Sequence, residues 1–337
     1  LGWLRALTDA RGLLEHAHHG VPRLGEGYTT DDNARALLYL SLLPEGARDE
    51  GLVRTYLAFL LHMQKEDGRF RNGLTLDGRF EDEGEAEDPT GRAVLALAAA
   101  QRLPPPYAGP AREALLRALP ALEGFTSLRG RAYALLGLLA LPKEPFLEAA
   151  EALGEGLLRA FREAEPAWPY PGPLTYANHR PVEALYAYGL AFRRQEAVAL
   201  ARRALAFLKE HYFTPGEEGL FFDPVGNRFM ARGRDKPLFD QQPIEAKCAL
   251  LAHLRFGERV LAEVAFLWFH GRNRLRAPLV DAFGPMDGLT PHGPNQNRGA
   301  EALLAYLLAW QALVQGVFPQ VDEGVALGRV FALGGRP

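Results

Sequence analysis

One pattern occurs six times along the chain: a short polar stretch is followed at once by a helix rich in alanine and leucine. The six copies are TTDDNARALLYL near residue 30, EDPTGRAVLALAAA near 88, SLRGRAYALLGLLA near 128, ANHRPVEALYAYGL near 178, FDQQPIEAKCALLAHL near 240 and NQNRGAEALLAYLLAW near 296. These helices carry little charge around their circumference, so we expect them to be buried on most sides. The recurrence predicts one structural unit that is used six times.

A second kind of helix, with one charged face, alternates with the first. It is predicted over roughly 51–64, 110–120, 146–163, 196–211 and 257–270, and a sixth copy over roughly 3–18. Six buried and six half-exposed helices fit an all-α (α/α)6 barrel, in which an inner ring of helices stands inside an outer ring. We predict one such domain over residues 1–337, with a C-terminal tail over roughly 316–337.

An open α-solenoid is the alternative architecture. Solenoid repeats usually keep a near-fixed period, whereas the polar stretches here are separated by roughly 40 to 62 residues. Connections of such unequal length favour a closed barrel with one elaborated face.

Composition argues against several other classes of protein. The formal net charge is -3 with both signs interspersed, so neither nucleic acid nor an anionic membrane is an expected partner. Cys248 is the single cysteine, which excludes an internal disulfide and a cysteine-cluster metal site. The apolar runs are too short to span a bilayer, and no signal peptide is visible after Leu1, so we expect a cytoplasmic protein. Asparagine is scarce, and such avoidance of thermolabile amides is typical of a thermophilic proteome. The oligomeric state is not indicated.

One charged position distinguishes the two halves of the chain. It follows a small or branched residue in each copy and is Arg35, Arg92 or Arg131 in the first three copies and Glu183, Glu245 or Glu301 in the last three. In a closed barrel, one half of the inner wall would therefore offer guanidinium groups and the other half carboxylates. Neighbouring copies are expected to pair Arg131 with Glu183. They are likewise expected to pair Arg35 with Glu301. Among these six positions, Arg92 and Glu245 are left without an adjacent opposite charge, so we expect them to contact a ligand.

Helix capping offers a simpler explanation for some of these polar residues. The prolines at 89, 181 and 243 lie where first-turn prolines belong, which would make Asp88, Arg180 and Gln242 the N-caps. Glu183 and Glu245 would then lie at the third helical position, where the helix dipole favours acids. Taken singly, each acid is explained as well by capping or the dipole as by chemistry.

The six helix N-termini would open on one side of the barrel and form a polar cup. Carboxylates and amides hydrogen-bond sugar hydroxyls, and aromatic rings stack on the C–H faces of sugars. Four of the seven asparagines lie in these stretches. The candidate substrate-binding residues are Tyr28, Asp31, Asn33, Arg92, Trp168, Tyr176, Asn178, His179, Arg180, Gln241, Gln242, Asp287, Asn297, Arg298 and Glu301.

Acidic residues cluster in the first, second and fifth polar stretches. Cleavage of a glycosidic bond needs a protonated carboxyl group near the leaving oxygen and usually a second carboxylate. Adjacent acids can raise the pKa of one of them, which suits a general acid. The catalytic candidates are, in order of preference, Asp32, Asp88, Asp240 and Glu245. Whether the reaction inverts or retains depends on distances that a sequence does not contain.

Other chemistries are less well supported. A metal could be held by the histidines at 16, 18 and 19 together with Asp31 and Asp32, but these histidines precede the first polar stretch and are expected to pack locally. Phosphate-binding and dinucleotide-binding glycine loops are absent from the sequence, as is the serine-nucleophile motif Gly-x-Ser-x-Gly. We therefore expect no metal and no cofactor.

The motifs GYTTDDNARAL, EDPTGRA, FDQQPIEA and NQNRGAEA together resemble those of bacterial six-hairpin glycosidase-like proteins. Those proteins carry GYxxDDNARAL, EDSHGRALWAL, FDQQPIEA and NxNQGAES signatures and are often labelled glycosyltransferase or glycosidase. The resemblance covers roughly residues 8–315 and implies the barrel fold, a carbohydrate-related role and the polar stretches as the shared site. The chain differs at Pro89-Thr90, where the family has Ser-His, and at Arg298, where it has glutamine, so a role for those family residues is not implied here.

These observations together predict an enzyme that cleaves a glycosidic bond in an oligosaccharide, most simply a hydrolase. A phosphorylase would need one acid and an anion pocket, for which His179, Arg180 and Arg298 are available. A sugar epimerase on this fold would be expected to use histidines, of which His179 and His292 lie in the polar stretches. A non-catalytic carbohydrate-binding protein would keep the cup without a productive arrangement of acids.

Overall fold

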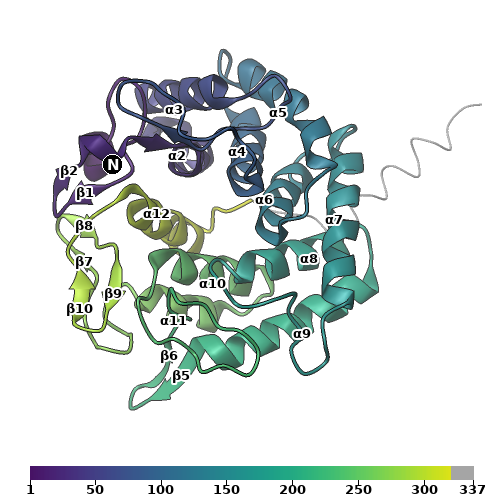
Figure 1. Ribbon diagram of the computed structural model, residues 1–337, viewed down its shortest axis with the longest axis vertical. Coiled ribbons are helices and arrows are strands. Elements are labelled where there is room, and N and C mark those ends of the chain that lie inside the picture. Colours follow the sequence, from purple (N-terminus) through teal and green to yellow (C-terminus); the bar gives the residue numbers. More distant parts are fainter. Residues whose placement is uncertain (320–337) are drawn as a thin grey trace, which may run out of the picture.

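The computed structural model describes residues 1–319 and contains a closed ring of six inner helices (Figure 1). These are α2 (Thr30–Leu42), α4 (Glu87–Ala99), α6 (Leu128–Leu139), α8 (His179–Ala191), α10 (Pro243–Arg255) and α12 (Ala300–Gln315). Each packs against the next, and α12 packs against α2, so the ring closes. The predicted all-α (α/α)6 barrel is confirmed. Most of the predicted C-terminal tail lies outside the described residues.

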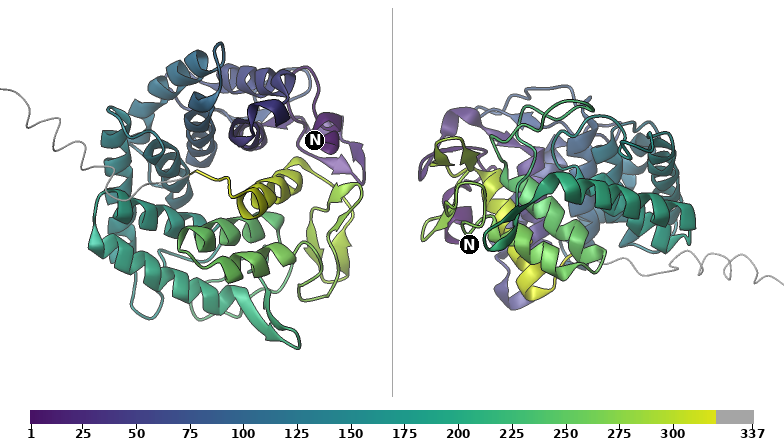
Figure 2. Two further views of the ribbon diagram at one scale, coloured as in Figure 1. Left: turned by 180° about the vertical axis from the view of Figure 1, so that it is seen from behind. Right: turned by 90° about the horizontal axis from the view of Figure 1, so that it is seen from below.

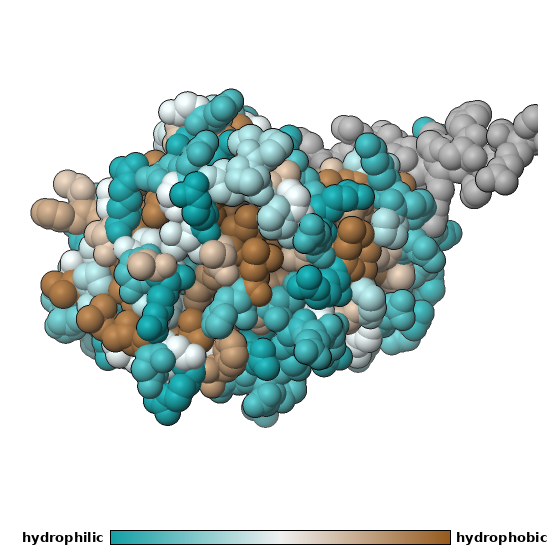
Figure 3. All heavy atoms as spheres, turned by 90° about the horizontal axis from the view of Figure 1, so that it is seen from above, coloured by the Kyte–Doolittle hydropathy of each residue, from teal (hydrophilic) through white to brown (hydrophobic). Residues whose placement is uncertain are grey.

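Five outer helices surround this ring, and Figure 2 shows the same two-layered arrangement from behind. They are α3 (Glu50–Met63), α5 (Ala108–Leu122), α7 (Phe146–Arg162), α9 (Gln195–Tyr212) and α11 (Arg259–Leu267). Each packs against the inner helix that precedes it in the chain. The five corresponding predictions are confirmed. Their outward faces are charged, and the side of the barrel in Figure 3 is accordingly mostly hydrophilic, with apolar residues in small separate patches.

The prediction of a sixth outer helix over residues 3–18 is wrong. Helix α1 covers only Gly2–Ala6, and the following segment ends in the short strands β1 (Ala17–His18) and β2 (Val21–Pro22). The Asp9 side chain accepts hydrogen bonds from the backbone amides of Arg11 and Gly12, which makes a turn and stops the helix. Gly12 also packs so closely that a Cβ there would lie 2.8 Å from Asn33 Oδ1.

The inner helices approach one another closely because they carry small residues on their contact faces. A Cβ at Gly91 of α4 would lie 2.5 Å from the carbonyl oxygen of Gly130 of α6. One turn further along, a Cβ at Gly137 would lie 2.7 Å from the Cα of Leu95. The alanine and glycine content of the repeated helices therefore sets the narrow bore of the barrel.

The connections at the two ends of the barrel differ in length. Inner helices lead to outer helices through the short segments 43–49, 100–107, 140–145, 192–194 and 256–258, which include the 3-10 turns η2 (Glu45–Ala47) and η3 (Ala100–Arg102). Outer helices lead back to inner helices through 64–86, 123–127, 163–178, 213–242 and 268–299. Four of these five are long, so the unequal spacing in the sequence is confined to the end where the inner helices begin.

The remaining short elements, which precede inner helices, elaborate that end. The strands pair antiparallel as β3 (Tyr28–Thr29) with β4 (Gly73–Leu74), β5 (Phe213–Gly216) with β6 (Gly219–Phe222), β7 (Val280–Asp281) with β8 (Gly284–Pro285), and β9 (Gly288–Thr290) with β10 (Gly293–Asn295); the 3-10 turn η1 (Leu24–Glu26) precedes β3. Within residues 1–319, no helix has the length and apolar character needed to cross a membrane.

The helix N-termini differ in part from the predicted caps. Helix α10 begins at Pro243 with Gln242 as its N-cap, as predicted. Helices α4 and α8 begin earlier than predicted, at Glu87 and His179, so Asp88 and Arg180 lie inside the first turn. The carboxylate of Asp88 is therefore not used as a cap.

Candidate active site at the open end of the barrel

Ion pairs join the first turns of three neighbouring inner helices, α12, α2 and α4. Asp31 of α2 lies 2.7 Å from Arg92 of α4. Asp32 pairs with Arg35, one turn further along α2, at 2.8 Å, and Arg35 reaches Glu301 of α12 at 3.2 Å. The predicted pairing of Arg35 with Glu301 is confirmed. Within the described residues none of the six aligned positions pairs with Arg92, as predicted, but Asp31, which lies outside those positions, supplies an opposite charge from the adjacent helix.

Asp88 extends this network from α4 towards α6 and α8. Its carboxylate accepts hydrogen bonds from the hydroxyls of Ser127 and Tyr176, both at 2.7 Å, and from Arg129 Nε at 3.1 Å. Burial alone would raise the pKa of Asp88, but these hydrogen bonds and the guanidinium groups of Arg92 and Arg129 outweigh it and hold the pKa below its ordinary value. Asp88 is therefore a firmly ionised carboxylate.

The surroundings of Asp32 raise its pKa, whereas those of Asp88 lower the pKa of that carboxyl group. Asp32 is 3% exposed, and burial raises its pKa to about 6 even though Arg35 stabilises the ionised form. Nearby Glu301 and Asp31 add to the rise because they carry the same charge. The open end of the barrel thus contains carboxyl groups whose surroundings move their pKa values in opposite directions.

Glu15 is an acid of this cluster that the sequence analysis missed. Its backbone carbonyl accepts a hydrogen bond from the Ala300 amide, which places it beside the start of α12. Burial, followed by the charge of Asp32, raises the pKa of Glu15 to about 7. One third of its side chain remains exposed. The missed signal was an acid just before the first polar stretch, in a segment that had been assigned to a helix.

Glu245 occupies the first turn of α10 and is 1% exposed. One carboxyl oxygen accepts a hydrogen bond from the backbone amide of Ala177, and the other has no hydrogen-bond partner. Burial raises the pKa of Glu245 to about 7, only partly offset by the hydrogen bond from Ala177 and the nearby hydroxyl of Tyr212. As predicted, Glu245 has no ion-pair partner in the part of the chain that the structure describes. It is a buried acid rather than an open contact surface.

Arg131 and Glu183 do not form their predicted pair. Arg131 donates to the carbonyl oxygens of Phe125 and Gly156 at 2.8 and 3.3 Å, on the outer side of the barrel. Glu183 pairs with Arg180 at 2.8 Å and with Arg255 at 3.0 Å. The predicted division of the inner wall into a guanidinium half and a carboxylate half is therefore wrong.

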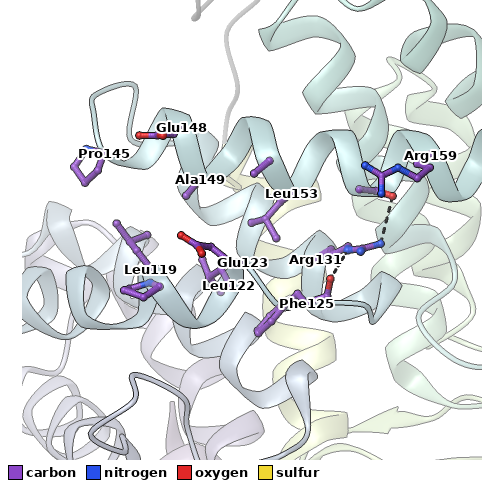
Figure 4. A pocket seen from close by; sticks show the side chains of 13 residues that line it. Leu119, Leu122, Glu123, Phe125, Arg131, Pro145, Glu148, Ala149, Leu153 and Arg159 are labelled. Carbon is purple, nitrogen blue, oxygen red and sulfur yellow. Dashed lines mark hydrogen bonds between the residues drawn. The ribbon is translucent and has the colours of Figure 1, made fainter.

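The groove next to Arg131 has a volume of about 510 Å³ and lies between α5 and α7 (Figure 4). Apolar side chains such as Leu119 and Leu153 line it together with Glu123 and Arg159. None of the predicted catalytic or substrate-binding residues belongs to it.

Two predicted binding residues in the first polar stretch fasten the N-terminal segment instead. Tyr28 is fully buried and donates its hydroxyl to Asp9 at 2.5 Å. Asn33 is fully buried, accepts from the Leu13 amide at 2.9 Å and donates to the Thr29 carbonyl at 2.8 Å. Both side chains are closed off from the open end by these contacts.

Two further predicted amides hold the longer connections in place. Asn178, fully buried, donates to the hydroxyl of Tyr212 at 2.7 Å. Gln241 is also fully buried and accepts from the indole of Trp268 at 2.9 Å. A buried amide with satisfied hydrogen bonds is a structural element, since it has no donors or acceptors left for a sugar.

The polar residues before α12 also have partners within the chain. Asn297 accepts from the His19 amide at 3.0 Å, and Arg298 pairs with Asp281 at 2.7 Å. Asp287 accepts from the Gly299 amide at 2.5 Å, and burial raises its pKa. Of these three, Asp287 is the one whose surroundings favour a proton on its side chain.

The other predicted residues lie away from the ion-pair network. Trp168 donates its indole N–H to the Gly172 carbonyl at 2.8 Å and packs against Phe207. Asp240 is exposed, and within the described residues its carboxylate has no hydrogen bond or ion pair linking it to Asp32 or Asp88. Gln242 is half-buried and makes no side-chain capping bond.

Neither of the two histidines predicted in the polar stretches has a contact with this network among the described residues, whereas His16 Nε2 lies 3.5 Å from Glu15 Oε1. His179 is fully buried, both of its ring nitrogens lack hydrogen-bond partners, and its ring lies 5.8 Å from that of His253. Burial lowers the pKa of His179 well below its ordinary value, so the ring is neutral. His292 is exposed in the turn between β9 and β10. From Leu1 to residue 319, no group of three or more His, Cys, Asp or Glu side chains has a metal-binding arrangement.

Solved structures match this chain over almost its whole length. A D-mannose isomerase superposes with a TM-score of 0.67 and 10% identity, covering 93% of this chain and 94% of that one. Cellobiose 2-epimerase from Bacillus thermoamylovorans B4167 gives 0.68 and 9%, covering 92% and 95%. The GH76 α-1,6-mannanase of Salegentibacter sp. HEL1_6 gives 0.59 and 13%, covering 92% and 94%. What this chain shares with them is the fold.

The mannanase structure is that of an inactive variant in complex with α-1,6-mannotetrose, in which two consecutive aspartates are replaced by alanine. No family model matches the sequence of the present chain, and no curated protein matches it. These structures confirm the six-hairpin barrel that the resemblance implied, at identities too low to carry over individual residues.

Proposed function

We propose that this protein is a carbohydrate-active enzyme that cleaves a glycosidic bond in an oligosaccharide at the open end of the barrel. Proteins of the same fold include sugar isomerases, sugar epimerases and a mannanase. The open end brings carboxyl groups, a tyrosine and arginines together around the starts of α2, α4 and α12. These are groups that hydrogen-bond sugar hydroxyls and supply the acid and base of glycoside hydrolysis.

The network of ion pairs and hydrogen bonds that joins the starts of α12, α2 and α4 is the observation that carries this proposal, and the contrast between Glu15 and Asp88 supports it. The pKa of Glu15 is raised to about 7, whereas that of Asp88 is held below its ordinary value. Around neutral pH, Glu15 keeps a proton in a large fraction of molecules while Asp88 is ionised. Carboxyl groups with pKa values pushed apart in one site are the arrangement that general acid and base roles require.

Glu15 is the proposed proton donor because its side chain is accessible as well as protonated. Asp32 lies behind it, buried, and its negative charge raises the pKa of Glu15. Asp32 is therefore a positioning residue in this proposal. The sequence favours Asp32 as the first catalytic candidate. In the structure we propose Glu15 instead, because its side chain can reach the leaving oxygen of a bound sugar.

Asp88 is the proposed ionised partner, acting either on a water molecule or on the anomeric carbon. Its side chain is 13% exposed, so part of it is accessible to solvent. The hydrogen bonds from Ser127 and Tyr176 leave a carboxylate lone pair free for a substrate or a water molecule. These two hydroxyls and Arg129 fix its orientation.

An oligosaccharide is the proposed substrate. The structure of a mannanase variant with the same fold is a complex with a mannotetraose, which supports this class of ligand. A sugar epimerase is less well supported, since His179 is buried and neutral and His292 is exposed in a turn.

The test is a screen of the purified protein against a panel of oligosaccharides, with and without inorganic phosphate. We expect release of free sugar from at least one substrate. Glu15→Gln and Asp88→Asn should each lower turnover roughly a hundredfold or more with little change in binding. Glu45→Gln, an exposed acid in η2, is the matched control and should leave turnover unchanged.

Other outcomes have defined meanings. Sugar phosphate formed only when phosphate is present would identify a phosphorylase. Binding without turnover by the unmodified protein would identify a carbohydrate-binding protein. Wild-type turnover in both Glu15→Gln and Asp88→Asn would refute the assignment of the acids.

A further inference from the structure

A narrow cavity lies on the axis of the barrel, and all six inner helices contribute to its lining. The lining is apolar except for Tyr133 and four cationic side chains, Arg35, Arg92, Arg180 and Lys247. The free volume of this cavity is about 10 Å³. A space of that size holds one water molecule or one ion of similar radius.

The three arginines each have an acidic partner. The acidic partners of Arg35 and Arg92 belong to the ion-pair network at the open end. Arg180 pairs with Glu183 at 2.8 Å. Glu183 also pairs with Arg255, so its charge is divided between two guanidinium groups. In addition, the Nε atoms of Arg35 and Arg180 are buried without a hydrogen-bond partner. The cavity wall therefore holds unused donors as well as positive charge.

Lys247 is the side chain without compensation. It is 3% exposed, lines the cavity, and has no hydrogen bond or ion pair among residues 1–319. Removing an ammonium group from water without a partner is costly. Burial, together with the charges of Arg180, Arg35 and Arg92, lowers the pKa of Lys247 to about 7. In its protonated form Lys247 therefore carries a charge that no acidic side chain among the described residues balances, and a bound anion would favour that form.

We propose that this cavity binds one small monovalent anion, of the size and charge of chloride, held by Lys247 and the surrounding arginines. A single anion matches both the one uncompensated charge and the space for one small particle. Phosphate or sulfate, with four oxygens around a central atom, is too large for it. A water molecule would satisfy donors but would leave the charge on Lys247 unbalanced. This site is separate from the proposed acid and base at the open end.

Crystallography with a heavier halide tests the position of the anion. Crystals of the full chain grown without halide are soaked in sodium bromide, and anomalous scattering is measured at the bromine edge. We expect a bromide peak on the barrel axis within hydrogen-bond distance of Lys247 Nζ. An axis occupied by water alone, with bromide bound elsewhere, would overturn the proposal.

Thermal unfolding provides the solution test. Sodium chloride is titrated against sodium methanesulfonate, whose larger anion does not fit the cavity, at equal ionic strength. We expect a saturable rise in Tm of roughly 2 °C or more that is specific to chloride. Lys247→Met, of similar shape but uncharged, should lose this rise, whereas the exposed-site control Lys143→Met should keep it.

The remaining results decide against the proposal. A chloride response that persists in Lys247→Met would show that the anion binds at another place. A response to inorganic phosphate but not to chloride would contradict a small monovalent ligand. Neither measurement depends on turnover. A negative result would therefore not bear on the roles of Glu15 and Asp88, which the oligosaccharide assay tests.

Discussion

Asp31 of α2 and Arg92 of α4 form an ion pair of 2.7 Å across the contact between two successive inner helices. Arg92 is 5% exposed and also donates to the hydroxyl of Tyr133 on α6 at 3.1 Å. One side chain therefore links three successive inner helices near their N-terminal ends. Those starts carry the carboxyl groups on which the proposed activity depends.

Arg92→Met is expected to lower the free energy of unfolding by roughly 2–4 kcal/mol, because it leaves Asp31 half-buried without its partner. Urea unfolding measures the change. The matched control is Arg276→Met, which removes an exposed pair with Glu217 and should cost less than about 1 kcal/mol. Equal losses in both variants would mean that the Arg92 pair contributes no more than a surface pair.

Asn33→Ala is expected to destabilise the protein by roughly 2–3 kcal/mol, because buried backbone groups of Leu13 and Thr29 lose their hydrogen bonds. Asn227→Ala is the control, since Asn227 is exposed and accepts from a single backbone amide. Chemical unfolding of the two variants gives the comparison. A destabilisation of Asn33→Ala no larger than that of the control would contradict a structural role for Asn33.

Glu245→Gln is expected to flatten the dependence of stability on pH between about 4.5 and 7. The folded-state pKa of Glu245 is raised, so in this window the folded protein holds a proton that the unfolded chain releases, and stability falls as the pH rises. Glutamine does not titrate, so the variant should lack the decrease of roughly 2–3 kcal/mol in the free energy of unfolding that Glu245 causes over this pH range. Unfolding measured at pH 5 and pH 8 tests this. The same slope in the variant and the parent protein would show that the pKa of Glu245 is not raised.

Asp32→Asn is expected to shift the alkaline limb of the pH–rate profile to lower pH. The negative charge of Asp32 helps to keep the proton on Glu15, so its removal lowers the pKa of the proposed acid. We expect a shift of up to about one pH unit with measurable turnover remaining. The profile is recorded with whichever oligosaccharide the screen identifies. Complete loss of activity with no shift would assign Asp32 a direct catalytic part instead.

The barrel was predictable because its signal is distributed over many residues. Six alanine-rich helices with charge-poor circumferences can be buried in few ways, so their positions followed from the sequence. The sixth outer helix was mispredicted because one local contact, the turn at Asp9, overrides the helical periodicity of residues 3–18. Such a turn depends on packing between Gly12 and Asn33, which periodicity does not reveal.

The site was less predictable because residue type does not fix side-chain direction. Asn33 and Gln241 belong to the polar stretches but point into the protein, where backbone and indole groups need partners. Arg92 pairs with Asp31 of the preceding copy, an acid that lies outside the aligned arginine and glutamate positions. Glu15 reaches the open end through the fold of the N-terminal segment, a tertiary effect.

The unequal connections have a consequence for how such a protein can change. The ring is fixed by small residues and by tight turns at one end, whereas segments 64–86, 163–178, 213–242 and 268–299 all lie at the other. Exchanging one of these segments would remodel the surface that receives a ligand without moving the ring. The segments that would determine ligand selectivity and the helices that form the barrel are thus encoded in separate stretches of the gene. Each set can vary independently of the other.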